Sequence, residues 1–267
     1  MKFRNGEGIL FEIGDSVKES LESRKRLVSK EKLIYSMAQA RKPFDFSQHL
    51  LSATTAIIAE VKFRSPSQGD LTDQLDPLAV AESYLKNGAT ALSVLTEEKY
   101  FKGSLSYLKA IRQKFPQCHL LMKDFIIDEY QLLEGKLAGA DAVLLIVALL
   151  AEEKLIELYD CATTLGLSIL VEVHNENELE IARRLNARLI GVNNRDLKTL
   201  KISLETSRHL IGHAPKGALM VCESGLETAD QIKEMKSLGF RGFLMGSSLM
   251  KTGRPGETLA DILREIP

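Results

Sequence analysis

The sequence predicts an α/β protein whose eight parallel strands close into a (β/α)8 barrel. Three observations support this prediction. The chain has 267 residues, a length typical of one such barrel. From residue 57 onward, short apolar runs alternate with amphipathic helical stretches, which is the pattern of parallel β/α units. The first run is followed by KFRSPSQGD, which lacks the G-x-G-x-x-G fingerprint typical of the alternative fold, an open doubly wound sheet with a nucleotide site.

Eight apolar runs are the predicted strands. They are nearly continuous rather than alternating, which indicates strands that are covered on both faces, as in a parallel sheet. The runs are 57–61, 91–95, 119–123, 142–147, 168–173, 188–193, 219–223 and 242–246.

Capping residues mark the helices between these runs. Asp76 followed by Pro77 is typical of an N-cap and a first helical position. Ser104, Asp128 and Thr228 are predicted to cap three further helices. Residues that end a helix follow at Gly88, Pro116, Gly139 and Gly239.

Residues 1–50 precede the repeat and are predicted to form a helical extension of one or two helices. The chain would then be a single domain of residues 1–267, with the barrel at 57–267. The extension could close the bottom of the barrel or cover its mouth, and the sequence leaves both alternatives open. Its basic cluster Arg24-Lys25-Arg26 is interpreted as a solvent-exposed helix face.

Composition and charge exclude several classes of function. A net charge of -1 predicts no nucleic-acid partner. The three cysteines Cys118, Cys161 and Cys222 contain no CxxC pair, which argues against a disulfide framework or a zinc site. The longest apolar run, residues 142–151, is too short to cross a bilayer, and no signal-peptide pattern is evident. We therefore expect a cytoplasmic protein with no membrane partner.

Polar residues end most of the predicted strands. Because the active site of a (β/α)8 barrel lies at the carboxyl ends of its strands, these residues are the candidates for chemistry. Charges within apolar strands need partners, so Lys62 and Lys123 are expected to pair with Glu60, Glu172 and Glu223. The alternative is an ion-pair network that only closes the barrel top.

Two further interpretations concern anions and metals. Small residues follow the last two strands, in Glu223-Ser224-Gly225 and Gly246-Ser247-Ser248, and favour a phosphate site over a mere tight turn. The carboxylates at the rim could instead bind a divalent metal, but two lysines and an arginine there oppose it, so no metal is predicted. His174 could be a general base, although a residue at this place more often begins a helix.

Several of these segments together resemble the indole-3-glycerol phosphate synthase family. EVKFRSPSQGD is similar to the family's E-x-K-x-x-S-P-S-x-G loop, and KDF, GVNNRDL and ESG follow in the family's order. The resemblance covers about residues 9–265. It implies a TIM barrel without a cofactor that converts 1-(2-carboxyphenylamino)-1-deoxyribulose 5-phosphate to indole-3-glycerol phosphate in tryptophan biosynthesis. The reaction consists of ring closure, decarboxylation and dehydration.

The resemblance also implies residue roles. Lys123 would be the general acid of ring closure and Glu172 a general base, while Glu60 would orient Lys62 and Lys123. Lys62 would hold substrate anions and is the alternative acid for dehydration, so the assignment of lysines to proton transfers stays open. The implied catalytic set is Glu60, Lys62, Lys123, Glu172, Asn193 and Ser224. The implied substrate-binding set is Ser65, Pro66, Phe101, Phe125, Arg195, Leu197 and Glu223, and the implied phosphate-binding set is Gly225, Gly246 and Ser247.

Two rival functions fit a phosphate-binding barrel. An isomerase acting on a related phosphoribosyl amine would lack the lysine pair. A non-catalytic barrel would be expected to lose Lys62, Lys123 or Glu172, and all three are present. The expected partner is a small phosphorylated substrate, and the expected assembly is a monomer or a weak homo-oligomer.

Overall fold

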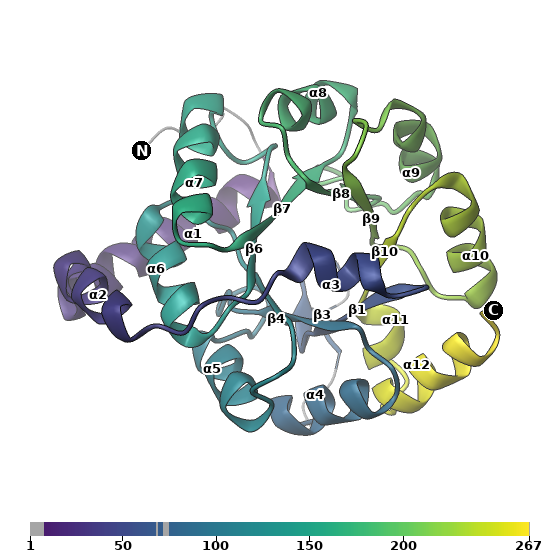
Figure 1. The fold of residues 1–267 in the computed structure, drawn as a ribbon, viewed down its shortest axis with the longest axis horizontal. Helices are drawn as coiled ribbons and strands as arrows, with labels where there is room; N and C mark the ends of the chain where they lie inside the picture. Colours follow the sequence, from purple (N-terminus) through teal and green to yellow (C-terminus); the bar gives the residue numbers. More distant parts are fainter. Residues whose placement is uncertain (1–7, 68, 72–74, 267) are drawn as a thin grey trace.

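The computed structural model describes residues 8–67, 69–71 and 75–266 and confirms the closed barrel. Eight parallel strands surround the axis in the order β1-β10-β9-β8-β7-β6-β5-β4, and β4 pairs back with β1 (Figure 1). The predicted runs match these strands to within a residue at each end. The strands are β1 (Ala56–Val61), β4 (Ala91–Leu95), β5 (Leu120–Lys123), β6 (Ala142–Ile146), β7 (Ser168–Val173), β8 (Leu189–Asn193), β9 (Leu219–Glu223) and β10 (Gly242–Met245).

Helices pack around the outside of the strands, and their predicted caps are confirmed. The side chains of Asp76, Ser104, Asp128 and Thr228 each accept a hydrogen bond from a backbone N–H in the first turn. Within the described residues, no helix has the length and hydrophobicity needed to cross a membrane. The outer helices are α4 (Pro77–Lys86), α5 (Leu105–Lys114), α6 (Glu129–Ala138), α7 (Glu152–Thr164), α8 (Glu176–Arg184), α9 (Glu205–Leu210), η2 (Ile211–His213), α10 (Ala229–Leu238), α11 (Ser247–Met250) and α12 (Pro255–Arg264).

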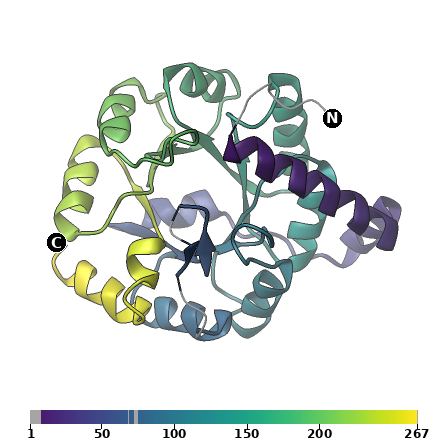
Figure 2. The same cartoon turned by 180° about the vertical axis from the view of Figure 1, so that it is seen from behind.

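The N-terminal extension forms more helices than predicted. It contains α1 (Ile9–Leu27), α2 (Lys30–Ser36), η1 (Met37–Gln39) and α3 (Phe46–Ser52). Figure 1 shows α3 across one end of the barrel, and Figure 2 shows α1 on the opposite side. His49 Nε2 lies 3.0 Å from the carbonyl oxygen of Thr90, just before β4, so α3 covers the amino ends of the strands. The extension therefore closes the amino ends of the strands with α3, while α1 lies on the opposite side and lines the mouth with Ile9, Leu10 and Ile13, so each alternative holds in part.

The basic cluster of α1 is not a solvent-exposed face, so that interpretation was wrong. Arg24 Nη1 pairs with Glu134 Oε2 at 2.5 Å, and Lys25 Nζ pairs with Asp128 Oδ2 at 2.9 Å. Only Arg26 of the three is exposed. The acidic partners belong to α6 and its N-cap, more than 100 residues away in the chain, so no local pattern could reveal the pairing.

Asp141, directly before β6, ties the extension to the barrel. Its carboxylate is fully buried and accepts hydrogen bonds from Arg41 Nη1 at 2.7 Å and Arg112 Nη2 at 2.5 Å. It also accepts from the backbone N–H groups of Phe44 and Leu120. One carboxylate thus joins the chain before α3, helix α5 and the start of β5.

We predict that Asp141→Ala lowers the free energy of unfolding by about 3–5 kcal/mol, because Arg112 would stay buried without its counter-ion. Urea denaturation followed by circular dichroism measures the change. Asp261→Ala, which removes an exposed partner of Arg264, is the control and should shift stability by less than about 1 kcal/mol. Equal denaturation midpoints for the two variants would contradict this role of Asp141.

Candidate active site

A pocket opens at the carboxyl ends of the strands. The empty space there is about 1160 Å³ when it is counted together with the solvent at its open mouth. Every site residue predicted from the sequence lines it. These residues are Glu60, Lys62, Ser65, Pro66, Phe101, Lys123, Phe125, Glu172, Asn193, Arg195, Leu197, Glu223, Ser224, Gly225, Gly246 and Ser247.

The floor of the pocket is a layer of charged side chains. Glu60, Lys123, Glu172 and Glu223 come from β1, β5, β7 and β9, which are alternate strands around the ring. Alternate strands of this fold contribute the four side chains of one interior layer, and such layers are usually built from bulky apolar residues. Here the uppermost layer consists of three carboxylates and one ammonium.

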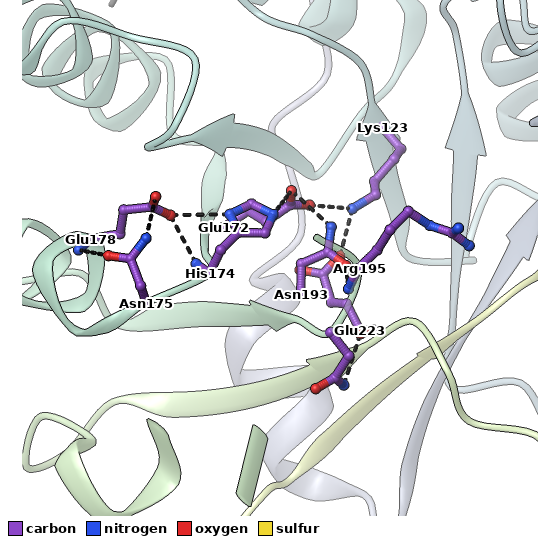
Figure 3. Close-up of polar contacts among 9 residues, drawn as sticks. Lys123, Glu172, His174, Asn175, Glu178, Asn193, Arg195 and Glu223 are labelled. Atoms are coloured by element: carbon purple, nitrogen blue, oxygen red, sulfur yellow. Dashed lines mark hydrogen bonds and ion pairs between the residues drawn. The ribbon is translucent and has the colours of Figure 1, made fainter. Parts of the chain in front are cut away.

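Lys123 is the central contact of this charged layer. Its Nζ donates to Glu172 Oε2 at 2.9 Å and to Glu223 Oε2 at 2.5 Å (Figure 3). The lysine side chain is 13% exposed and the two carboxylates are almost fully buried. Asn193 Nδ2 donates to the other oxygen of Glu172 at 3.1 Å. The pairing expected from the strand ends is therefore present, and it holds Glu172 from two sides.

Lys62 and Glu60 form a second ion pair, with Nζ and Oε1 2.5 Å apart. Gly246 gives Glu60 its space, because a Cβ at that position would lie 2.6 Å from Glu60 Oε1. The charge of Glu60 also acts on Lys123. Glu60 thus pairs directly with Lys62 and acts on Lys123 through its charge.

The pKa values of Lys123, Glu172 and Glu223 are shifted in different directions by burial and by the neighbouring charges. Burial lowers the pKa of Lys123, but the charges of Glu172 and Glu223 outweigh it and raise that pKa above its usual range. Burial raises the pKa of Glu172, but the Lys123 ammonium and the hydrogen-bonded His174 and Asn193 lower it overall. For Glu223, burial and the charge of Glu172 prevail over Lys123 and raise the pKa. The site therefore holds an ammonium acid, an ionised carboxylate and a carboxyl group that binds a proton readily, which is how acid and base roles are separated in one pocket.

The loops after β9 and β10 are built from small residues. Ser224 and Gly225 have positive φ angles of 64° and 85°, and a Cβ on Gly225 would lie 2.6 Å from Ile202 Cγ2. Ser248 Oγ donates to the carbonyl oxygen of Leu226 at 2.8 Å, which joins the two loops. Both loops line the pocket, where the sequence predicted the phosphate site.

An apolar wall also lines the pocket, beside the charged layer. The rings of Phe101 and Phe125 lie 5.7 Å apart between centroids, and Leu144 and Ile146 of β6 also line the pocket. The absence of a polar residue at the end of β6 is thus explained by this wall. Ile9, Leu10 and Ile13 of α1 extend it, and the sequence did not predict that contribution.

Arg195 reaches from the loop after β8 to the loop after β1. Its Nη1 donates to Ser67 Oγ at 2.8 Å and to the carbonyl oxygen of Leu200 at 3.2 Å. The loop after β1 carries two short antiparallel strands that the sequence did not predict, β2 (Arg64–Ser65) and β3 (Gly69–Asp70). Arg195 is partly buried beside this loop, and burial lowers its pKa.

Comparison with known proteins identifies the family. Residues 10–261 match the family described as indole-3-glycerol phosphate synthase. The chain belongs to this family. An indole-3-glycerol phosphate synthase of Bacteroides thetaiotaomicron is 42% identical over 260 residues, covering 97% of this chain and 98% of the relative. That of Salinibacter ruber is 41% identical over 261 residues, covering 96% of each chain.

Solved structures with low sequence identity support the fold of this synthase-family chain. The 3-hexulose-6-phosphate synthase of Salmonella typhimurium has a TM-score of 0.63 at 14% identity, covering 79% of this chain and 99% of that one. Thiamine phosphate pyrophosphorylase of Pyrococcus furiosus has a TM-score of 0.59 at 16% identity, covering 82% and 96%. These likenesses bear on the barrel architecture alone.

Two residues matter to the synthase-family site more than the sequence indicated. Gly191 of β8 lies beside the charged layer, and a Cβ there would lie 1.8 Å from Glu223 Oε1. A glycine within a strand often marks a close approach of another group to the backbone, and this signal could have revealed the contact from the sequence.

His174 does not begin the helix, because Asn175 is the N-cap of α8. Its ring lies between Glu172 and Glu178 instead.

The rim carboxylates of the pocket form no metal-binding group among the described residues. Lys62 pairs with Glu60, and Lys123 pairs with Glu172 and Glu223. Among the described residues, only the exposed side chains of Glu176, His209 and His213 bring three donor atoms within 4.8 Å of one another. They lie outside the pocket, and we assign no metal to them.

We predict that Gly191→Ala lowers kcat at least tenfold, because the added methyl group would displace the Glu223 carboxylate from Lys123. Steady-state kinetics on the purified variant measures the loss. Gly212→Ala is the matched control, since nothing lies within 4 Å of a Cβ at Gly212, and it should keep normal turnover. Unchanged kinetics in Gly191→Ala would show that the position of Glu223 does not matter.

Proposed function

We propose that this chain is an indole-3-glycerol phosphate synthase acting on 1-(2-carboxyphenylamino)-1-deoxyribulose 5-phosphate. It closes the pyrrole ring, releases CO2 and water, and forms indole-3-glycerol phosphate. Family membership over residues 10–261 supports the proposal. The observation that carries it is the Lys123 ammonium, held by two carboxylates at the floor of a pocket with one apolar wall. The reaction needs such an acid next to an aromatic ring.

Lys123 is the proposed general acid of ring closure. The aromatic carbon that bears the carboxylate attacks the substrate ketone, and the ketone oxygen must gain a proton as the new bond forms. Lys123 carries a proton at neutral pH, and the carboxylates that raise its pKa fix the ammonium in place while making it a weaker acid than a free lysine. The charged ammonium also stabilises the negative charge that develops on that oxygen.

The apolar wall is the proposed seat of the anthranilate ring. Phe101, Phe125 and Leu197 offer apolar surface to the ring, while Lys62 and Arg195 supply positive charge for the substrate anions. Loss of CO2 restores aromaticity once the ring has closed. An apolar environment favours this step because the carboxylate loses charge as it leaves.

Glu172 is the proposed base of dehydration. The hydroxyl group leaves with a proton from an acid, and the amine proton passes to a carboxylate. Glu172 fits because its lowered pKa keeps it ionised, and because Asn193 and Lys123 fix both of its oxygens. Lys62, oriented by Glu60, is the alternative acid for the leaving hydroxyl.

The remaining parts of the proposal concern binding and context. Gly225, Gly246 and Ser247 are the proposed phosphate ligands, and Ser65, Pro66 and Ser224 are also proposed to contact the substrate.

We further propose that residues 1–267 act as one domain, as a monomer or weak homo-oligomer, in the cytoplasm. Three free cysteines are in keeping with a reducing compartment. The net charge of -1 supports the absence of a nucleic-acid partner.

We predict that the purified protein forms indole-3-glycerol phosphate from this substrate, detected by the fluorescence of the indole product. Turnover should need no added metal or redox cofactor and should persist in the presence of a chelator. Absence of product over a broad pH range, with substrate binding retained, would favour a non-catalytic phosphate-binding barrel instead.

We predict that Lys123→Ala lowers kcat by about 10²–10⁴-fold, the usual contribution of a positioned general acid. Stopped assays for the indole product measure it, and thermal unfolding checks that the variant is folded. Lys233→Ala, which removes an exposed partner of Asp230, is the control and should keep normal turnover. Near-normal kcat in Lys123→Ala would refute the acid assignment.

A further inference from the structure

His174 stands beside the proposed base without having a role in the proposed mechanism. It follows β7, two residues after Glu172, and side chains two residues apart in a strand point to the same face. The His174 ring therefore lies next to the Glu172 carboxylate, with Nε2 3.4 Å from Oε1. Its side chain is 12% exposed and that of Glu172 is 3% exposed, so water screens this ion pair weakly.

A second carboxylate fixes the other side of the ring. His174 Nδ1 lies 3.0 Å from Glu178 Oε2, in the first turn of α8 (Figure 3). Glu178 is itself held, because it accepts from the backbone N–H of His174 at 2.8 Å and from Asn175 Nδ2 at 2.8 Å. Its own backbone N–H donates to Asn175 Oδ1. Glu178 is thus a fixed, buried anion whose side chain makes no contact with the pocket.

The ring between these carboxylates is protonated. Burial by itself lowers the pKa of His174, but its contacts with Glu172 and Glu178 and their negative charges outweigh burial and raise the pKa to about 10. Both ring nitrogens then carry protons. Nε2 is shielded from solvent and makes no hydrogen bond, and Glu172 Oε1, 3.4 Å away, is the carboxylate oxygen with which it forms an ion pair.

We propose that His174 is a positioning residue whose imidazolium, anchored by Glu178, keeps the Glu172 carboxylate ionised and turned toward the substrate. The proposal rests on the role of Glu172 as base. Three groups then hold Glu172: His174 and Asn193 at Oε1, and Lys123 at Oε2. Lys123 must release a proton during ring closure, which would remove one of the two positive charges next to Glu172. His174 supplies a positive charge that takes no part in that transfer.

The alternative is that His174 only supports the start of α8. That support comes from backbone atoms, since the His174 N–H binds Glu178 and Asn175 is the N-cap. Replacing the ring leaves these contacts in place, so a variant such as His174→Gln should keep the fold. A structural role would therefore leave the pH dependence of turnover unchanged, whereas a role through the charge of Glu172 would not.

The charged groups around Glu172 decide the sign of the effect. Lys123 on β5 and His174 after β7 lower its pKa, while Glu223 on β9 and Glu60 on β1 are the carboxylates of the same layer, and Asn193 on β8 is neutral. A base with a lowered pKa is active above that pKa and loses activity as the pH falls through it. Removing the imidazolium takes away one cation and raises the pKa of Glu172. The acid limb of the rate profile then moves to higher pH.

The test compares the pH dependence of kcat and kcat/KM in wild type and His174→Gln. We expect the acid limb to move to higher pH by about one unit, the usual effect of losing a neighbouring opposite charge. At neutral pH Glu172 stays ionised in both proteins, so the severalfold fall in kcat that we expect there reports the lost orientation of its carboxylate, while KM should change less than threefold. His209→Gln is the matched control: His209 also contacts a carboxylate, that of Glu176, but lies outside the pocket, and its profile should match wild type.

Two further variants make the result decisive. Glu178→Gln keeps the imidazole but removes its anchor, and it should move the acid limb in the same direction by a smaller amount. Glu172→Gln tests the proposed base itself. If Glu172→Gln is inactive while the profiles of His174→Gln and Glu178→Gln superimpose on wild type, the positioning role is wrong and the proposed function stands. If Glu172→Gln keeps normal turnover, Glu172 is not the base, and the positioning role of His174 is refuted together with that part of the proposed function.

Discussion

The ammonium group of Lys123, shared between the carboxylates of Glu172 and Glu223, is the interaction on which the rest of the site depends. It joins β5, β7 and β9 across the barrel interior, at the level where other barrels of this fold have apolar side chains. Buried carboxylates without a cation would be strongly unfavourable, so Lys123 offsets much of the cost of burying Glu172 and Glu223. Its position also sets the unequal proton affinities of Glu172 and Glu223.

The surroundings of this layer follow from its geometry. Gly191 and Gly246 leave space for Glu223 and Glu60, because a methyl group at either position would overlap a carboxylate oxygen. Asn193 completes the contacts of Glu172. The charged floor lies against an apolar wall formed by β6, by two aromatic rings and by the first turns of α1. A substrate with an aromatic ring at one end and anionic groups at the other matches this division of the pocket.

The parts that could be predicted from the sequence depend on local chemistry. Strand runs, N-caps such as Asp76 and Thr228, and the helix-ending glycines involve residues within a few positions of each other. The candidate residues were found because parallel strands bring their carboxyl ends to one rim, a rule that needs no coordinates. By contrast, the partners of Arg24 and Lys25 lie on α6, and the crowding at Gly191 comes from β9. These contacts join segments that are distant in the chain, so they cannot be predicted from the periodicity and spacing of the sequence.

The sequence by itself determined the (β/α)8 architecture, the set of polar residues at the mouth and the family, because alternating apolar runs and short motifs are local properties of the chain. The tertiary structure decided what those residues do to one another. It placed Lys123 between Glu172 and Glu223, and His174 between the same Glu172 and Glu178. It also placed α3 across the amino ends of the strands and α1 on the opposite side of the barrel. Distances of about 3 Å between side chains on different strands determine charge, orientation and proton affinity. Such distances are fixed only when the barrel closes.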